Sequence, residues 1–272
     1  MKIIQIGDVY GSTGRKAVAQ HLPLLIKTYS PDFISANVDN AAHGSGITAK
    51  ILRELEGYGI DFFFGGDHCV RRSGHEEVLN MHRNIIRPAN YAPSVAGRGS
   101  SLFITTGGQK ILAIHLAGQV FMESYNSPFG VIEQILDHHK LGDSTDAIIV
   151  DFHAEATSEK VAMGRILDGR VSAVLGTHTH IPTADAMILP NKTGYITDIG
   201  MTGDYNSVIG ADKAVPLEKF STGIKKGRFE PAEGEGTLCA MVITLDDKTG
   251  LTQKIEPIRI GGFWDKMIYH TR

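Results

Sequence analysis

The sequence contains only two cysteines, Cys69 and Cys239, in 272 residues. A disulfide framework is therefore not expected, and a reducing compartment is the default surrounding for the chain. No apolar run approaches the roughly 20 residues that a membrane-spanning helix requires. The first residues carry one lysine and four apolar side chains before a Gly-Asp pair, which predicts a strand and not a secretion signal. These absences predict a cytoplasmic protein without a membrane partner.

An excess of charge of one sign is also lacking. The chain has 27 Lys and Arg against 30 Asp and Glu, a formal net charge of −3. A protein that binds nucleic acid by general electrostatics needs a basic excess, so no extended nucleic-acid surface is expected. The apolar content of 42% and the length favour a single domain over residues 1–272. The Gly- and Lys-containing stretch 203–236 is expected to be an irregular excursion, a small cap or lid.

Short β-rich runs alternate with amphipathic stretches, which predicts an α/β fold built in layers. Strands are expected at residues 2–6, 33–37, 60–64, 102–105, 111–115, 147–152, 171–175 and 195–197, with a late antiparallel hairpin at 237–245 and 251–260. Helices are expected to begin at Ser12 or Thr13, at Thr48, at Ser127 and at Thr157. Pro23 lies inside the first helix pattern and predicts a kink or a break there.

Acidic, amide or imidazole side chains follow five of these strands. In chain order they are Asp8, then Asp39 and Asn40, then Asp67 and His68, then His153 with its neighbours Asp151 and Glu155, and finally His178 and His180. Loops at the carboxyl ends of strands in an open α/β sheet converge on one crevice. Five such strand ends in succession therefore predict one shared site.

The chemistry of this set indicates a metal centre. Carboxylates and an amide offer oxygen ligands and histidines offer nitrogen, a mixture that suits Mn, Fe, Zn or Mg. Two cations about 3.5–4 Å apart need a shared carboxylate to lower their repulsion. His178 and His180, taken alone, could equally close an ordinary strand. On an extended strand end they would point to the same side about 6–7 Å apart, each toward a different metal, with Thr179 facing away.

Five motifs, "GDVYG", "NVDNAAHG", "GGDH", "DFHAEATSEK" and "GTHTHIPTAD", together resemble the calcineurin-like metallophosphoesterase superfamily. They resemble most closely its YmdB-like branch of bacterial 2′,3′-cyclic-nucleotide phosphodiesterases. Further stretches such as "IIRPANY" and "TDIGMTGDYNSVIG" extend the resemblance over nearly the whole chain. It implies a layered α/β/β/α sandwich and a binuclear metal-dependent enzyme. Such an enzyme hydrolyses small phosphodiesters by attack of a metal-held hydroxide on phosphorus.

The resemblance also implies roles for individual residues. Asp8, Asn40 and His180 would hold the first metal ion. Asp67, His153 and His178 would hold the second, with Asp39 bridging both, and catalytic His68 would protonate the leaving group. The two ions, divalent or trivalent, would be iron or manganese, with zinc or magnesium as alternatives.

The sequence departs from the branch at two of these positions. Asp39 replaces the usual bridging Glu, and Asp67 replaces the Asn of Gly-Asn-His. A carboxylate at position 67 adds negative charge beside the metals and removes an amide that could donate a hydrogen bond to phosphate. The superfamily's Asp-X-His is also absent at Asp8-Val9-Tyr10, as elsewhere in the branch, and Asn40 would fill that gap.

Other functions stay open at this point. The chain could be a metal-binding regulatory protein with weak or lost catalysis, or a phosphomonoesterase of the same superfamily. An amidohydrolase also uses His-X-His, but on its first barrel strand. Arg71 could be solvated or could contact substrate, and His115 and Cys69 are expected to be buried structural residues. The metal, the physiological substrate and the oligomeric state, a homo-oligomer included, are not determined by the sequence.

Overall fold

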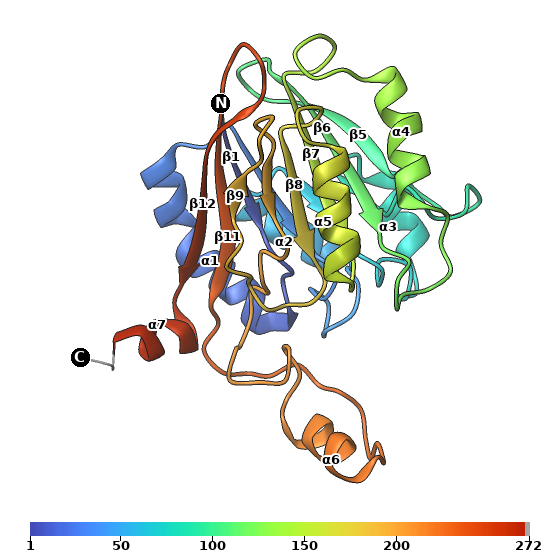
Figure 1. Cartoon of the computed structure of the whole chain (residues 1–272). Coiled ribbons are helices and arrows are strands. Elements are labelled where there is room, and N and C mark those ends of the chain that lie inside the picture. Colours follow the sequence, from blue (N-terminus) through green and yellow to red (C-terminus); the bar gives the residue numbers. More distant parts are fainter. Residues whose placement is uncertain (270–272) are drawn as a thin grey trace.

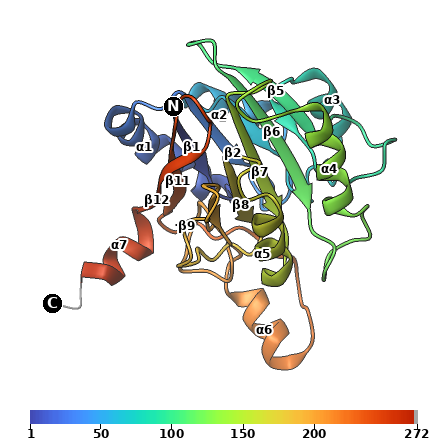
Figure 2. The same cartoon turned by 45° about the horizontal axis from the view of Figure 1, so that its top comes forward.

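The computed structural model describes residues 1–269, which form two mixed sheets with helices on their outer faces (Figures 1 and 2). The first sheet has the order β12-β11-β1-β2-β3-β4 and comprises β1 (Lys2–Ile6), β2 (Phe33–Asn37), β3 (Phe62–Phe64), β4 (Ile85–Ile86), β11 (Leu238–Leu245) and β12 (Thr252–Ile260). The second has the order β5-β6-β7-β8-β10-β9 and comprises β5 (Ser100–Ile104), β6 (Lys110–Ala117), β7 (Ala147–His153), β8 (Ala173–Thr177), β9 (Met187–Ile188) and β10 (Gly194–Ile196). The helices are α1 (Gly11–Tyr29), α2 (Ala49–Gly57), α3 (His75–Met81), α4 (Pro128–His138), α5 (Thr157–Ile166), α6 (Ala214–Thr222) and α7 (Gly262–Tyr269).

Alternation along the strands produces three apolar layers. One face of each sheet meets the other sheet, where Ile3 and Phe33 of the first pack in one cluster with Ile149 of the second. The opposite face of the first sheet carries residues such as Ile4 against α1 and α2. The opposite face of the second carries residues such as Val150 against α4 and α5. The layered α/β/β/α prediction is therefore confirmed.

Most predicted strand and helix positions agree with the structure, but the first helix does not. It begins at Gly11 after Tyr10, not at Ser12 or Thr13, and runs to Tyr29 without the predicted break at Pro23. Pro23 is exposed, so the helical carbonyl that lacks its usual N–H donor can be hydrated instead. Thr48 caps α2 as predicted, since its side chain accepts from the backbone N–H of Ile51.

Parallel pairing brings the polar strand ends to one edge. The strands β1, β2 and β3 run parallel in the first sheet, and β6, β7 and β8 run parallel in the second. Their carboxyl ends therefore meet on the same side of the sandwich. No helix within residues 1–269 has an apolar stretch of the length that crossing a membrane would take.

The stretch 203–236 leaves the sandwich and returns to it at adjacent positions. Gly203 and Thr237 pair in an antiparallel bridge, and a second bridge joins Ala211 to Pro231. Between them lies α6, which Figure 1 shows well away from both sheets. Within α6 only Pro216 is buried. This segment, which we call the excursion, therefore takes little part in the core.

Candidate metal centre

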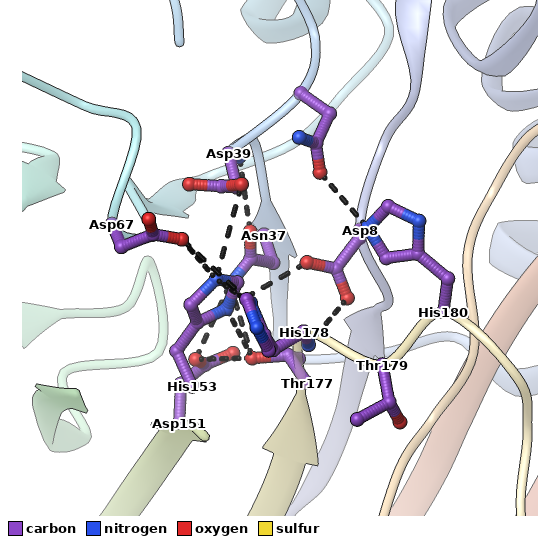
Figure 3. A network of polar contacts seen from close by, with 12 residues as sticks. Asp8, Asn37, Asp39, Asp67, Asp151, His153, Thr177, His178, Thr179 and His180 are labelled. Atoms are coloured by element: carbon purple, nitrogen blue, oxygen red, sulfur yellow. Dashed lines mark hydrogen bonds and ion pairs between the residues drawn. The ribbon is translucent and has the colours of Figure 1, made fainter. Parts of the chain in front are cut away.

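The structure brings the eight predicted site residues to one edge of the sandwich. They follow five strands, with Asp8 after β1, Asp39 and Asn40 after β2, Asp67 and His68 after β3, His153 at the end of β7, and His178 and His180 after β8. Figure 3 shows Asp8, Asp39, Asp67, His153 and His178 directed toward a common centre. These side chains come from both sheets, so the site depends on the packing of the whole sandwich.

Three overlapping groups of side chains could each hold a cation, because their ligand atoms lie within 4.8 Å of one another. The groups are Asp67 with His153 and His178, Asp8 with Asp39 and His153, and Asp39 with Asp67 and His68. Asp39, Asp67 and His153 each belong to two groups. The first group is the predicted ligand set of the second metal, and the sharing of Asp39 is what a bridging ligand requires.

Asp8 is the clearest sign that a cation belongs here. It is fully buried, and its Oδ1 has no hydrogen-bond partner among residues 1–269. Its Oδ2 accepts only the backbone N–H of His178, at 3.2 Å. Burial raises the pKa of Asp8 to about 6, although His153 and His180 oppose that rise. A buried carboxylate oxygen without a partner is unfavourable, so the donor set fits a cation that would complete it.

Asp39 is held by the turn that follows β3. Its Oδ1 accepts the backbone N–H of His68 at 2.7 Å, and Gly66 packs directly against the carboxylate. A Cβ on Gly66 would lie 2.0 Å from Asp39 Oδ1, and the backbone φ of +67° is also one that favours glycine. The side chain of His68 lies against the same carboxylate, with Nδ1 2.7 Å from Asp39 Oδ2. Glycine at position 66 is therefore needed for this arrangement.

The pKa of His68 reflects this contact. Burial alone would lower the pKa, but Asp39 and then Asp67 raise it above the ordinary histidine value. The side chain remains 20% exposed, so one side of the ring can meet a molecule in the cleft. A histidine whose charged form is favoured, and which lies outside the group of Asp67, His153 and His178, can act as a general acid.

The group of Asp67, His153 and His178 forms around His153. Its Nε2 lies 3.1 Å from Asp67 Oδ1 and 3.1 Å from Nδ1 of His178. Burial, and then the charge of His153, lower the pKa of His178 to about 3, so its ring is in the neutral form that binds metals. Burial would raise the pKa of Asp67, but His153, His68 and His178 hold it below its usual range. Arg71, which the sequence left open, donates from Nη2 to Asp67 Oδ2 at 3.2 Å.

His180 and Asn40 pair with each other at the other side of the site. His180 Nε2 lies 3.0 Å from Asn40 Oδ1, and its Nδ1 lies 2.7 Å from the carbonyl oxygen of Ile209 in the excursion. Asn40 also contacts His68, with Nδ2 3.0 Å from Nδ1. The predicted assignment of Asn40 and His180 to the first metal stays a prediction.

The expectation of an extended strand at His178 and His180 is wrong. The strand β8 ends at Thr177, and the backbone φ is +98° at His178 and +68° at His180. Non-glycine residues in this region are strained by about 1–3 kcal/mol, a cost typical of functional sites. Thr179 turns away from the cluster, as predicted, and its Oγ1 donates to Asp198 at 2.7 Å (Figure 3). Both rings reach the site because the chain turns between them.

A buried polar network under His153 was missed by the sequence analysis. Thr177 Oγ1 lies 2.9 Å from His153 Nδ1 and donates to Asp151 Oδ1 at 3.0 Å. Asn37 Nδ2 and Gln5 Nε2 also donate to Asp151, at 3.3 and 2.7 Å. We call Asn37, Asp151 and Thr177, all fully buried, the floor of the site. The signal was Asp151 two residues before His153, on the same side of a strand inside an apolar run.

His115 connects this floor to the turn at Gly66. The ring is fully buried, as expected, with Nδ1 3.0 Å from Asp151 Oδ1. Its Nε2 accepts the backbone N–H of Gly66 at 2.9 Å. The same buried side chains therefore position His153 on β7 and, through Gly66, Asp39 after β2.

A cleft of about 820 Å³ opens beside the ligand cluster. One wall is formed by the strand-end residues, including Asp39, His68 and His178. The facing wall is formed by the excursion, including Phe229 and Arg228. A molecule bound at the metal centre would therefore also touch the excursion.

Comparisons with known proteins agree with this geometry. Residues 4–258 match the family described as YmdB-like protein. The chain is 41% identical over 260 residues to the 2′,3′-cyclic-nucleotide 2′-phosphodiesterase of Bacillus subtilis, which covers 96% of this chain and 97% of the relative. The crystal structure of a novel phosphatase from Mycoplasma pneumoniae is 34% identical and superposes with a TM-score of 0.89, covering 96% and 93% of the two chains. The calcineurin-like phosphoesterase YfkN from Bacillus subtilis, 10% identical, shares the fold with a TM-score of 0.52 over 96% and 90% of the chains.

Proposed function

The chain belongs to the YmdB-like family of phosphoesterase hydrolases, and from this premise we propose that it hydrolyses 2′,3′-cyclic nucleotides at a binuclear metal centre. The observation that carries the proposal is the set of overlapping ligand groups in which Asp39, Asp67 and His153 are shared. The Oδ1 of Asp8 supports the same conclusion, because it accepts no hydrogen bond among residues 1–269 and has His153 Nδ1 only at 3.7 Å. The relative's activity on cyclic nucleotides suggests the substrate.

The group of Asp67, His153 and His178 supplies one proposed ligand set, and the resemblance supplies the other. Asp67, His153 and His178 would hold one ion, Asp8 with the paired Asn40 and His180 would hold the other, and Asp39 would be shared between them. When bound, the two cations neutralise charge on the phosphate oxygens and activate the attacking water.

The chain's own residues supply orientation and the proton. One edge of the His68 ring faces the cleft and the other edge contacts Asp39, which stabilises the charged form of the ring before substrate binds. As the phosphorus–oxygen bond to the ribose breaks, the proton of His68 passes to the departing 2′- or 3′-oxygen. His153 is fixed by Thr177 from below, so its ring cannot turn away from the cluster.

Elemental analysis paired with hydrolysis assays tests the proposal. Purified protein supplied with manganese or iron is expected to bind two ions and convert adenosine 2′,3′-cyclic phosphate to a phosphate monoester. Activity on p-nitrophenyl phosphate alone would favour a phosphomonoesterase. If metal-loaded protein released no monoester from any cyclic nucleotide or generic diester, the catalytic proposal would fail and a metal-binding regulatory role would be favoured.

A further inference from the structure

The wall of the cleft that faces the metal centre has an unusual composition. It belongs to the excursion and presents three cations, Lys219, Lys225 and Arg228, together with the aromatic rings of Phe220 and Phe229. The rest of the lining includes four proposed metal ligands, Asp39, Asn40, His178 and His180, together with His68, Arg71 and Glu155. The cleft therefore has a catalytic side and a second side rich in positive charge and aromatic surface.

The three cations on this wall have no carboxylate partner. Among residues 1–269, none of Lys219, Lys225 and Arg228 forms an ion pair. Two other lysines of the same segment are engaged elsewhere. Lys226 pairs with Glu218 at 2.7 Å, and Lys213 donates to the Asn206 side chain at 3.0 Å. The cations of the excursion that form no ion pair therefore line the cleft. The two lysines outside the cleft are bound to side chains of the excursion.

The aromatic rings are open to a ligand. Phe220 is 78% exposed and Phe229 is 41% exposed. Lys225 Nζ lies 4.2 Å from the centroid of the Phe229 ring, and Lys219 Nζ lies 5.7 Å from it. Exposed aromatic faces beside Lys and Arg are the combination that binds single-stranded nucleotides, with bases stacked on the rings and phosphates on the cations.

The charge of the simplest substrate leaves these cations unused. A 2′,3′-cyclic mononucleotide has one phosphate and one negative charge, and the proposed mechanism places that phosphate against the ligand cluster. The three cations of the excursion wall, which form no ion pair, then meet no phosphate of the substrate, although Asp39 and Glu155 also line the cleft. A substrate with a second phosphate would supply one, because it would place negative charge on both sides of the cleft.

We infer that the excursion wall is a nucleotide subsite, and that the preferred substrate is a 2′,3′-cyclic phosphate carrying a further phosphate on its 5′ side. Such a group occurs at the 3′ end of a short oligoribonucleotide, where the next phosphate joins another nucleoside. It also occurs in a nucleoside bearing a 5′-monophosphate. The inference rests on the proposed function. It requires no extended nucleic-acid surface, because it concerns only the terminal nucleotides.

Three substrates test the inference in the metal-loaded full-length protein. They are adenosine 2′,3′-cyclic phosphate, the same compound with a 5′-phosphate, and the adenylyl dinucleotide that ends in a 2′,3′-cyclic phosphate. The two compounds with a second phosphate are expected to have kcat/KM values roughly 10- to 100-fold higher, mainly through KM. The preference should shrink as salt is added. A further gain for the dinucleotide would assign the second phosphate to an internucleotide link, with its extra base stacked on the rings.

Matched substitutions separate the subsite from the rest of the excursion. Lys225→Gln and Arg228→Gln should each reduce the preference for the second phosphate roughly 3- to 10-fold. Lys213→Gln and Lys226→Gln remove the same charge from the same segment, outside the cleft, and should leave the preference unchanged. Phe229→Leu should reduce the gain of the dinucleotide over the 5′-phosphate compound.

Distinct results would overturn the inference and the proposed function. Hydrolysis of all three substrates with equal kcat/KM, or an equal loss of preference in the control variants, would overturn the inference alone. It would also be wrong if Phe220→Ser and Phe229→Ser changed the molar mass measured by light scattering but left the preference intact, since the rings would then bind a second copy of the chain. If the metal-loaded protein hydrolysed none of the three substrates, the proposed function itself would be overturned.

Discussion

The floor of the site and the excursion that faces it are held in opposite ways. Asn37, Asp151 and Thr177 of the floor are fully buried and hydrogen-bonded to one another. In the excursion, α6 has only Pro216 buried and carries Phe220 almost fully in solvent. The floor beneath the ligands and the excursion across the cleft thus differ in burial, in hydrogen bonding and in strand pairing.

We expect the two regions to have different roles, metal ligation and chemistry on the floor side and substrate selection in the excursion. Metal ligation and in-line attack need side chains positioned to within about 0.5 Å, which requires a packed and fully hydrogen-bonded supporting shell. Substrate selection by charge and stacking tolerates a looser arrangement, since ionic and stacking contacts depend weakly on exact geometry. We therefore expect changes on the floor side to abolish chemistry, and changes in the excursion to alter which substrate is used.

The largest effect is expected from His178→Ala. It removes a nitrogen from the group of Asp67, His153 and His178, so metal occupancy should fall and activity should drop below detection. Elemental analysis and cyclic-nucleotide hydrolysis measure the two effects. His138→Ala, on the exposed end of α4, is the matched control and should change neither. A fully loaded and active His178→Ala protein would contradict the ligand assignment.

His68→Ala should separate chemistry from metal binding. The metals should remain bound, because Asp67, His153 and His178 are untouched, while kcat should fall roughly 10²- to 10⁴-fold through loss of the general acid. The loss should be smaller for a substrate with a good leaving group such as bis-p-nitrophenyl phosphate. Unchanged turnover of cyclic nucleotides would remove the catalytic role from His68.

Asp151→Asn tests whether the floor acts through the ligands. Asn37, Gln5 and Thr177 all donate to this carboxylate, and an amide would turn one N–H toward these donors. Misorientation of His153 should then weaken metal affinity by roughly 10- to 100-fold, measured by competition with a chelator. The exposed Asp143→Asn is the control. Unaltered affinity would show that the floor has only a structural role.

Removal of residues 213–229, the part of the excursion that contains α6, should affect substrate use more than folding. The backbone N–H of Asp212 donates to the carbonyl of Glu230 at 2.8 Å, so residues 213–229 can be replaced by an Asn-Gly turn between paired positions. Metal content and melting temperature should be preserved, because α6 contributes only Pro216 to the interior. KM for a 2′,3′-cyclic phosphate that carries a second phosphate on its 5′ side should rise by roughly tenfold, and KM for the cyclic mononucleotide should change less. Loss of the metals on excision would contradict the division between floor and excursion.

The smallest effect is expected for Asp67→Asn. The amide oxygen can still approach the metal, and the amide N–H₂ can donate to phosphate, whereas the ion pair with Arg71 is lost. Activity should be preserved or improved, within about threefold of the parent, as judged by kcat/KM at saturating metal. A variant that binds both ions but is inactive would show that the carboxylate at position 67 has its own role.

The sequence predicted what depends on local pattern. Apolar alternation placed β1, β2 and β7 within one residue of their observed bounds, and strand ends marked Asp8, Asp39 and His153. Thr48 was recognisable because a cap acts on its own helix. These features involve neighbours in sequence, so a single chain reveals them.

The rest depends on contacts between distant segments. Asp151 acquires its role only when Gln5 and Asn37 of the first sheet meet the second sheet. The left-handed backbone at His178 and His180 is imposed by bonds from Asp198 and the excursion, not by their own residue types. Such tertiary determinants leave little signal in one sequence.

We propose that the ligands supported by the floor form a binuclear centre on which activity depends. The most direct measurement is a titration of metal-free protein with manganese, in which calorimetry counts the bound ions. The rate of hydrolysis of adenosine 2′,3′-cyclic phosphate is measured at each step of the same titration. The structure predicts two equivalents bound per chain and activity that reaches its maximum only as the second equivalent is filled. Full activity in metal-free protein, or with a single ion bound, would contradict it.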